Sequence, residues 1–301
     1  MIKAKKILFH SMIGVCLLFV CACTEDIIMD VPEGKKVPVV EGYLTNEYKR
    51  HEVILSYSTE LYSEEKDMIQ GATVYAVNGK DTIWYHEQEN KPGHYLTDSV
   101  AGKKRHRYHF EIRVGDNPLY PRPLRMYAEV YMPNNVTTID SVGLLPKWNQ
   151  ADIPFVDDTS AVCVCPYFQT LSDPDIIYNV ELYLNGVRYK NRPSKLFQLF
   201  PMKGYAGYYF NGSEMLHGKA AVPVGIMNKY YLHEGDVVKV KLHSIYEDYM
   251  YFLLAQKLAV GVNPVMGAYP AVYSNIFSDC NAIGWIATTS VVEGEGIYHE
   301  F

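Results

Sequence analysis

Hydrophobic residues alternate with polar ones over several short runs of this chain. In Tyr108–Val114 every second residue is apolar or aromatic, and the residues between them, such as His109 and Arg113, are polar. This period of two is typical of a strand with one buried face. The same pattern recurs in three further runs: Val53–Tyr57, Tyr178–Leu184 and Val238–Leu242. The alternation favours sheets that cover a core with one face.

Two Asn-Gly pairs follow strand-like runs. Asn78-Gly79 comes after Ala72–Val77, and Asn185-Gly186 comes after Tyr178–Leu184. Both residue types tolerate the positive φ angles that two-residue hairpin turns require. The chain also contains 26 tyrosines, and tyrosine favours strands. We therefore predict an all-β fold in which neighbouring strands pair antiparallel.

The first 22 residues have the layout of a secretory signal. Three lysines precede an apolar stretch from Ile7 to Val20, which is shorter than the roughly 20 residues that a membrane-spanning helix needs. The sequence Val20-Cys21-Ala22-Cys23 resembles a lipobox, the cleavage motif of bacterial lipoproteins. We predict cleavage after Ala22 and lipid attachment at Cys23. The alternative is an ordinary signal peptide with an incidental cysteine.

The residues after Cys23 bear on localisation. Thr24 stands where Asp would signal retention in the inner membrane, and Glu25-Asp26 resembles the acidic surface-export signal of Bacteroidetes lipoproteins. Each buried methylene of an acyl chain contributes about 0.8 kcal/mol, so two or more chains anchor a protein stably. We expect the mature protein on the outer membrane, facing outward, with residues 23–36 as a tether.

A Pro- and Asn-containing stretch at Met132–Asn135 divides the mature chain. We predict one β domain at residues 37–132 and a second β-rich domain at residues 133–301. The 301-residue chain, with 48% hydrophobic residues, is long enough for two such cores.

One helix is expected near residues 246–258, in the second domain. Ser244 and Glu247 form a capping box at its start. The residues expected on its apolar face are Tyr246, Tyr249, Met250, Leu253, Leu254 and Leu258. We expect this face to pack on the second sheet.

The chain carries few residues in patterns that support chemistry. His86-Glu87 and His233-Glu234 lack the second histidine of a zinc-protease helix, and Gly212-Ser213-Glu214 lacks the second glycine of a nucleophile elbow. His106 and His109 would lie on opposite faces of a strand, where they share no metal ion. We therefore predict no catalytic residues, no metal site and no cofactor.

Nucleic acid is excluded as a partner by charge. The whole chain has a formal net charge of −6, and its only basic cluster, Lys103–Arg107, is short and falls in an expected turn. Binding to a phosphate backbone depends on many Lys and Arg residues that displace counterions.

Three cysteines and a group of tyrosines leave alternatives open. The cysteines are Cys163, Cys165 and Cys280. They are either buried free thiols, or Cys280 forms a disulfide with one of the other two, or the three thiols bind a soft metal ion. The tyrosines are either cross-strand pairs within a sheet, which we favour, or an exposed platform for a sugar or peptide. They are Tyr205, Tyr208, Tyr209, Tyr230 and Tyr231.

Several segments, taken in order, resemble a Bacteroidetes lipoprotein family, domain of unknown function 4249. They are Val37–Asn46, Gly71–Tyr75, Gly93–Tyr95, Tyr178-Asn179, Gly235–Val240, Tyr246–Tyr251, Asn263-Pro264 and Ser274–Ile276. The stretch from Phe277 to Trp285 departs from the glycine-rich ending of the family. The resemblance implies an immunoglobulin-like or carboxypeptidase-regulatory-like first domain, genes beside TonB-dependent outer-membrane receptors, and no known catalytic activity.

These observations together predict a surface-exposed lipoprotein without enzymatic activity. Its expected role is that of an accessory or ligand-binding partner of a TonB-dependent transporter in nutrient uptake. Two alternatives remain, namely a surface adhesin or structural module, and a hydrolase with a dispersed site.

Overall fold

The computed structural model of the protein describes part of the chain. The described residues are 35–59, 65–116, 119–120, 122–134, 138–145, 161–168, 176–189, 199–201, 220–221, 225–261 and 273–300. The predicted leader 1–22 and most of the predicted tether 23–36 therefore lie outside the described residues. Residues Lys36–Phe301 form one compact unit.

Strands make up most of the described chain, and α2 (Glu247–Gly261) is the one α-helix in it, beside the short 3-10 turn η2 (Lys229–Tyr231). The strands are β1 (Pro38–Thr45), β2 (Glu52–Tyr57), β3 (Thr73–Asn78), β4 (Asp81–Gln88), β5 (Lys91–Thr97), β6 (Arg107–Val114), β7 (Leu124–Tyr131), β8 (Ile139–Leu145), β9 (Ala161–Phe168), β10 (Ile177–Leu184), β11 (Val187–Arg188), β12 (Leu199–Pro201), β13 (Ala220–Ala221), β14 (Gly225–Asn228), β15 (Val237–Ile245), β16 (Phe277–Ser278) and β17 (Ile283–Ile297). The protein is an all-β sandwich with one short helix, which confirms the predicted fold class.

The first hydrophobic core is built by consecutive strands of the larger sheet, in the order β17-β1-β2-β5-β4-β3-β6-β7-β16. Alternating residues of β6 point into it, because Tyr108, Phe110, Ile112 and Val114 are each at most 4% exposed. The predicted period-two pattern in this strand is therefore confirmed. β2 contributes its three predicted residues to the same core.

The second hydrophobic core lies between two sheets. One is the β11-β10-β15-β17 end of the larger sheet, and the other is a smaller sheet in which β9 pairs with β8, β13 and β14. Val164 and Phe168 of β9 share this core with Val180 of β10 and Val240 of β15. The Phe168 ring meets the edge of the Tyr178 ring, with 5.5 Å between the two centroids. The predicted strands at Tyr178–Leu184 and Val238–Leu242 are thus confirmed.

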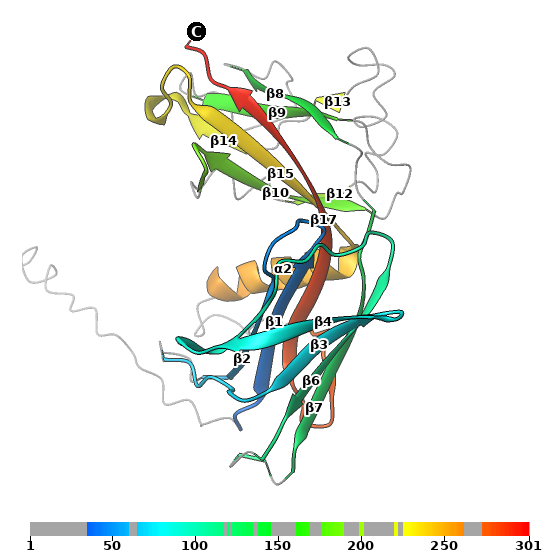
Figure 1. Ribbon diagram of the computed structural model, residues 1–301. Coiled ribbons are helices and arrows are strands. Elements are labelled where there is room, and N and C mark those ends of the chain that lie inside the picture. Colours follow the sequence, from blue (N-terminus) through cyan, green and yellow to red (C-terminus); the bar gives the residue numbers. More distant parts are fainter. Residues whose placement is uncertain are drawn as a thin grey trace, which may run out of the picture. The chain divides into compact units, whose positions relative to one another are not determined.

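One long strand, β17, belongs to both cores (Figure 1). Its first half runs parallel to β1, from the pair Val39–Ile283 to the pair Thr45–Thr289. Its second half runs antiparallel to β15, beginning at the pair Ser244–Ser290. The first core therefore includes residues from the end of the chain, while the predicted division into domains 37–132 and 133–301 stays a prediction.

Both predicted Asn-Gly hairpins are present. Gly79 takes a φ of 60° between β3 and β4, whose last and first residues pair as Asn78–Asp81. Asn185 and Gly186 take φ angles of 49° and 81° between β10 and β11. Two successive positive φ angles give the twist that matches the flanking strands.

The helix is present where it was expected, but its buried face was predicted only in part: Tyr249 and Leu253 of that face do pack inward. Leu254 is 37% exposed, whereas Phe252, which was not assigned to the apolar face, is 6% exposed. Phe252 packs against Trp285 and Ala287 of β17. Tyr43 of β1 joins this cluster, so α2 covers the stretch where β17 pairs with β1 and does not pack on the second sheet. Spacing along a helix does not show which neighbour the helix will meet.

The predicted capping box at the start of α2 was also wrong. Ser244 still belongs to β15, where it pairs with Ser290, and it is fully buried. Its Oγ has no hydrogen-bond partner within the described residues. The ladder of β15 continues to Ile245, so the backbone at Ser244 is extended and its hydroxyl is not placed over the first helical turn.

Candidate functional site

A cavity of about 500 Å³ opens beside the start of α2. Its walls come from the start of β6, the end of β7, the first half of β17, the junction of β15 with α2, and the segment before β16. A volume of this size falls within the range of small-molecule sites in proteins. The cavity is therefore the candidate functional site of the described residues.

Asn275 lines one side of this cavity, and its side chain hydrogen-bonds to the backbone of β17. Its side-chain amide donates to the carbonyl oxygen of Ile286 at 2.8 Å, and its Oδ1 accepts from the Ile286 amide at 3.0 Å. The chain then continues into β16, which pairs with β7. The segment thus connects β17 to β7, and Asn275 satisfies the backbone groups of Ile286 at the cavity wall.

Aromatic rings form much of the cavity wall. Tyr249 stacks on Trp285 with 5.8 Å between ring centroids, and Phe252 stacks on Trp285 from within the cluster at 5.0 Å. Tyr131 and Tyr246 lie across from each other at 6.1 Å. Mutual packing of this kind fixes the rings, so the wall is shaped before any ligand arrives.

The charged lining residues are Arg107, Glu129, Glu247 and Asp248. The Arg107 guanidinium lies 6.0 Å from the centre of the Tyr131 ring. Glu129 also contacts His109, outside the lining, with 2.5 Å between Oε1 and Nδ1. Burial lowers the pKa of His109, but its contacts with Glu129 and Glu111 outweigh burial and raise that pKa.

Thr288 adds an unusual polar group to the lining. The residue is 7% exposed, and its Oγ1 has no hydrogen-bond partner among the described residues. Buried hydroxyls in proteins are normally paired, so an unpaired one at a cavity wall is a candidate ligand contact. The described lining contains no serine, cysteine or histidine, and within the described residues no group of three His, Cys, Asp or Glu side chains is placed to hold a metal ion. This lining is suited to stacking, hydrogen bonding and charge pairing.

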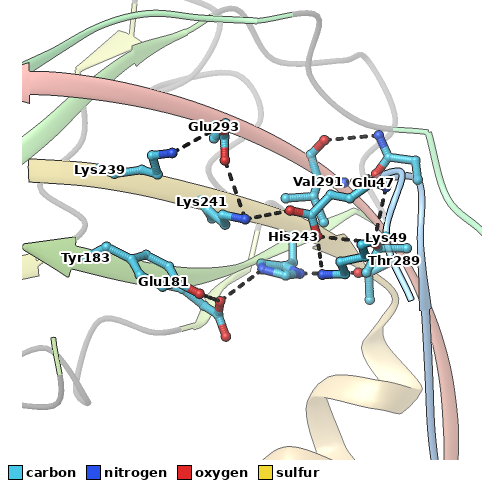
Figure 2. A network of polar contacts seen from close by, with 12 residues as sticks. Glu47, Lys49, Glu181, Tyr183, Lys239, Lys241, His243, Thr289, Val291 and Glu293 are labelled. Atoms are coloured by element: carbon cyan, nitrogen blue, oxygen red, sulfur yellow. Dashed lines mark hydrogen bonds and ion pairs between the residues drawn. The ribbon is translucent and has the colours of Figure 1, made fainter. Parts of the chain in front are cut away.

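A polar network lies on residues of β15 and β17 that are close in the chain to the lining residues Ile245 and Thr288 (Figure 2). His243 Nδ1 lies 2.6 Å from the hydroxyl of Tyr43, which lies 3.0 Å from Thr289 Oγ1. On its other side, His243 Nε2 lies 3.5 Å from a carboxylate oxygen of Glu181. Burial by itself would raise the pKa of Glu181, but its contacts with His243, Tyr183 and Arg188 lower the pKa to about 2.

A second part of the network joins the loop after β1 to β15 and β17. Lys241 contacts Glu47 at 2.5 Å and Glu293 at 3.4 Å. Asn46 pairs with the backbone of Val291, donating to its carbonyl at 3.2 Å and accepting from its amide. Figure 2 shows these contacts converging where β17 passes from the first core to the second. The network therefore joins the loop after β1 to β15 and β17, two strands that contribute lining residues to the cavity.

The family of the chain follows from a comparison with models of protein families. The family model described as domain of unknown function (DUF4249) matches residues 24–295. The chain belongs to this family. The predicted resemblance to domain of unknown function 4249 is thereby confirmed. No curated protein matches the chain. The DUF4249 match includes the whole first core, all of the second core except Tyr298, and every lining residue of the cavity.

The predicted lipidation site Cys23 and the predicted export signal Glu25-Asp26 lie outside the described residues. Among the residues that the structure does describe, no helix is long and apolar enough to cross a membrane. Lipidation at Cys23 and surface export through Glu25-Asp26 therefore remain predictions.

The three cysteines are placed within the described residues. Cys163 and Cys165 are buried on β9, and Cys280 is partly buried before β17. Cys165 and Cys280 are free thiols, so the alternative of a disulfide from Cys280 is not realised. Burial raises the pKa of the Cys165 thiol, as expected for a cysteine that packs as a small apolar residue.

The tyrosine prediction was wrong for the two residues that can be assessed. Tyr230 and Tyr231 lie on η2 and are 76% and 61% exposed, so they form no cross-strand pairs within a sheet. Tyr205, Tyr208 and Tyr209 lie outside the described residues.

The two histidines that were considered as a pair are also described. His106 precedes β6 and His109 lies within it, and His106 Nδ1 lies 2.7 Å from the Lys104 carbonyl oxygen.

Sequence reasoning missed the cavity. Tyr246 and Tyr249 were noted only as members of an apolar helix face, and Trp285 only as part of the divergent ending. The lining comes from five segments of the chain, and no single segment carries a motif. Only the three-dimensional arrangement brings these residues together.

Proposed function

We propose that this protein is a lipid-anchored accessory of a TonB-dependent transporter, which binds a small ligand at the outer surface and presents it to the transporter without breaking covalent bonds. The observation that carries the proposal is the preformed aromatic cavity beside α2, whose described lining offers binding groups. The lipobox that ends at Cys23 and the DUF4249 membership support the setting.

Membrane attachment makes a modest docking interface sufficient. An anchored protein shares the membrane plane with its partner, so its effective concentration near that partner is high. The predicted tether of about fourteen residues extends by at most about 3.5 Å per residue. This length allows the folded unit to reach a neighbouring transporter.

Lipidation and partner capture test this proposal together. We expect Cys23→Ala to release the protein from membranes or to leave its precursor uncleaved, whereas Cys21→Ala, two residues away, should remain anchored. Mass spectrometry of the mature amino terminus measures the modification, and membrane fractionation measures the anchoring. The tagged wild type should co-purify with a large outer-membrane transporter in mild detergent, and deletion of its gene should reduce uptake of one nutrient.

Two results would contradict the proposal. One is a mature amino terminus without lipid. The other is turnover of a glycan or peptide by the purified protein with no transporter in the eluate, which would favour the hydrolase or adhesin alternatives.

A further inference from the structure

The cavity beside α2 has a charge imbalance. Three carboxylates, from Glu129, Glu247 and Asp248, line it against the single guanidinium of Arg107. We propose that this cavity binds a small organic cation, a molecule that carries an amine next to a flat apolar ring. This inference rests on the proposed ligand-binding function and names the chemical class of its ligand.

The carboxylates are not all explained by the helix. Glu247 and Asp248 lie in the first turn of α2, where negative charge stabilises the positive end of the helix dipole. Glu247 also accepts from the Tyr251 hydroxyl at 2.9 Å. Glu129 belongs to β7, on a different wall; it has no such role in α2, and its Oε1 lies 2.5 Å from His109 Nδ1, outside the lining. Its side chain is 51% exposed, so it meets both the cavity and solvent.

The aromatic wall suits the same ligand class. The faces of tyrosine and tryptophan rings carry partial negative charge and attract cations within about 6 Å of the ring centre. Tyr131, Tyr246 and Trp285 all line the cavity. Arg107 already lies 6.0 Å from the Tyr131 ring centre, which shows that this ring accommodates a cation.

Thr288 supplies a second, independent observation. Its Oγ1 is buried without a hydrogen-bond partner among the described residues, and the residue lines the cavity. An ammonium group has three donors and no acceptor, so it needs several oxygen atoms around it. A hydroxyl oxygen together with carboxylates on two walls provides such a set.

A charge series of probes tests the ligand class. Benzylammonium, benzyl alcohol and benzoate share one ring and differ in charge, and each is titrated into the detergent-solubilised full chain with ligand-detected nuclear magnetic resonance. We expect benzylammonium to bind about tenfold more tightly than benzyl alcohol, with benzoate weakest, and added salt to narrow the difference.

Two substitutions locate the effect. Glu129→Gln should weaken benzylammonium about fivefold and leave benzyl alcohol unchanged, because it removes one charge and keeps the shape. Thr288→Val should weaken benzylammonium about threefold without lowering the thermal midpoint, because it removes only an unpaired hydroxyl. The matched control is Glu41→Gln, since Glu41 pairs with Lys66 outside the lining.

The outcomes separate this inference from the proposed function. Equal affinity for the alcohol and the ammonium, tighter binding of benzoate, no binding of any probe, or equal effects of Glu129→Gln and Glu41→Gln would each overturn the cation assignment. Co-purification of a transporter is measured without these probes, so it stands or fails separately. A neutral polyol that binds better than benzylammonium would also overturn the assignment while leaving ligand presentation intact.

Discussion

The two halves of β17 show how one strand serves two kinds of packing. The eight residues from Gly284 to Val291 are all buried; they make up most of the first half and the first two positions of the second. The first core covers one face of the first half, and α2 with Tyr43 covers part of the other. From Val292 onward the exposure alternates, and Glu293 and Glu295 point outward. A strand covered on both faces has no charged side chains in its buried stretch, whereas a half-exposed antiparallel strand alternates.

Each half also contains a glycine at a close approach between backbones. Gly284 has a φ of 123°, and a Cβ atom there would overlap the carbonyl oxygen of Val40 in β1. A Cβ atom at Gly296 would overlap the carbonyl oxygen of Val142 in β8. The two positions therefore report on the first and the second core, respectively.

Replacing these glycines should have the largest effects on stability. Gly284→Ala should lower the free energy of unfolding by about 2–4 kcal/mol, because it adds backbone strain to a clash with main-chain atoms. Gly296→Ala, at an ordinary φ, should lower it by about 1–3 kcal/mol through the clash alone. Urea unfolding followed by fluorescence and far-ultraviolet circular dichroism measures both.

The same experiment sharpens the comparison of the two cores. If β17 makes them one cooperative unit, both variants shift a single transition; if they unfold separately, each variant shifts its own. Gly115→Ala is the matched control, since a Cβ atom there meets nothing and should change stability by less than about 0.5 kcal/mol. A control as damaging as Gly284→Ala would contradict the packing argument.

The sequence predicted those parts of the fold that depend on local patterns. The alternation in Tyr108–Val114 and the Asn-Gly pairs each contain the information they need, because strand burial and turn conformation are set by neighbouring residues. The strand β17 was missed, since its first half mixes apolar residues with Gly284, Thr288 and Thr289 without alternation, and its second half reads as Glu-Gly repeats. Parallel pairing with β1, more than 240 positions earlier, leaves no local signal.

The candidate site was predictable only in part. The helix that contributes Tyr249 was found from its periodicity, but its orientation depends on Trp285 and Tyr43, which come from two distant strands. Glu129 stands in no motif, and nothing in the surrounding sequence marks it as a lining residue. A site that is assembled from five segments has no spacing that a single sequence could reveal.

Neutralising one buried carboxylate in each part should have an intermediate effect. Glu111 on β6 has a side chain 1% exposed, and contacts with Arg125 and Arg113 lower its pKa to about 2. Glu181 on β10 also has a pKa of about 2, as its contacts outweigh burial. We expect Glu111→Gln and Glu181→Gln each to cost about 1–3 kcal/mol at pH 7, as the partners lose their counter-charge.

The pH dependence of these losses follows from the lowered pKa values. A carboxyl group whose pKa is lower in the folded protein than the ordinary 4.5 stabilises the fold above that value, and this contribution disappears as pH falls towards about 2. The difference between wild type and each variant should therefore shrink between pH 5 and pH 2, measured by thermal unfolding. A difference that stays constant with pH would mean that packing, and not charge, underlies the loss.

The smallest expected effect concerns the link between the two parts of the chain. Glu47, in the loop after β1, contacts Lys241 of β15 at 2.5 Å, and their side chains are 22% and 18% exposed. Burial by itself would raise the pKa of Glu47, but Lys241 and Lys49 together lower it to about 2, so the carboxylate is charged and paired. A double-mutant cycle of Glu47→Gln and Lys241→Gln should give a coupling energy of about 1 kcal/mol.

The control cycle uses Lys239 and Glu295, a cross-strand pair within the second part of the chain. Their charged atoms lie 3.0 Å apart, and their side chains are 28% and 54% exposed. For this pair we expect a coupling energy of at most about 0.5 kcal/mol. Raising the salt concentration should reduce the control coupling more than the Glu47 coupling, because exposed charges are screened more strongly than partly buried ones. Equal couplings in both cycles would mean that the Glu47 contact is an ordinary surface pair and that the backbone of β17 alone joins the two cores.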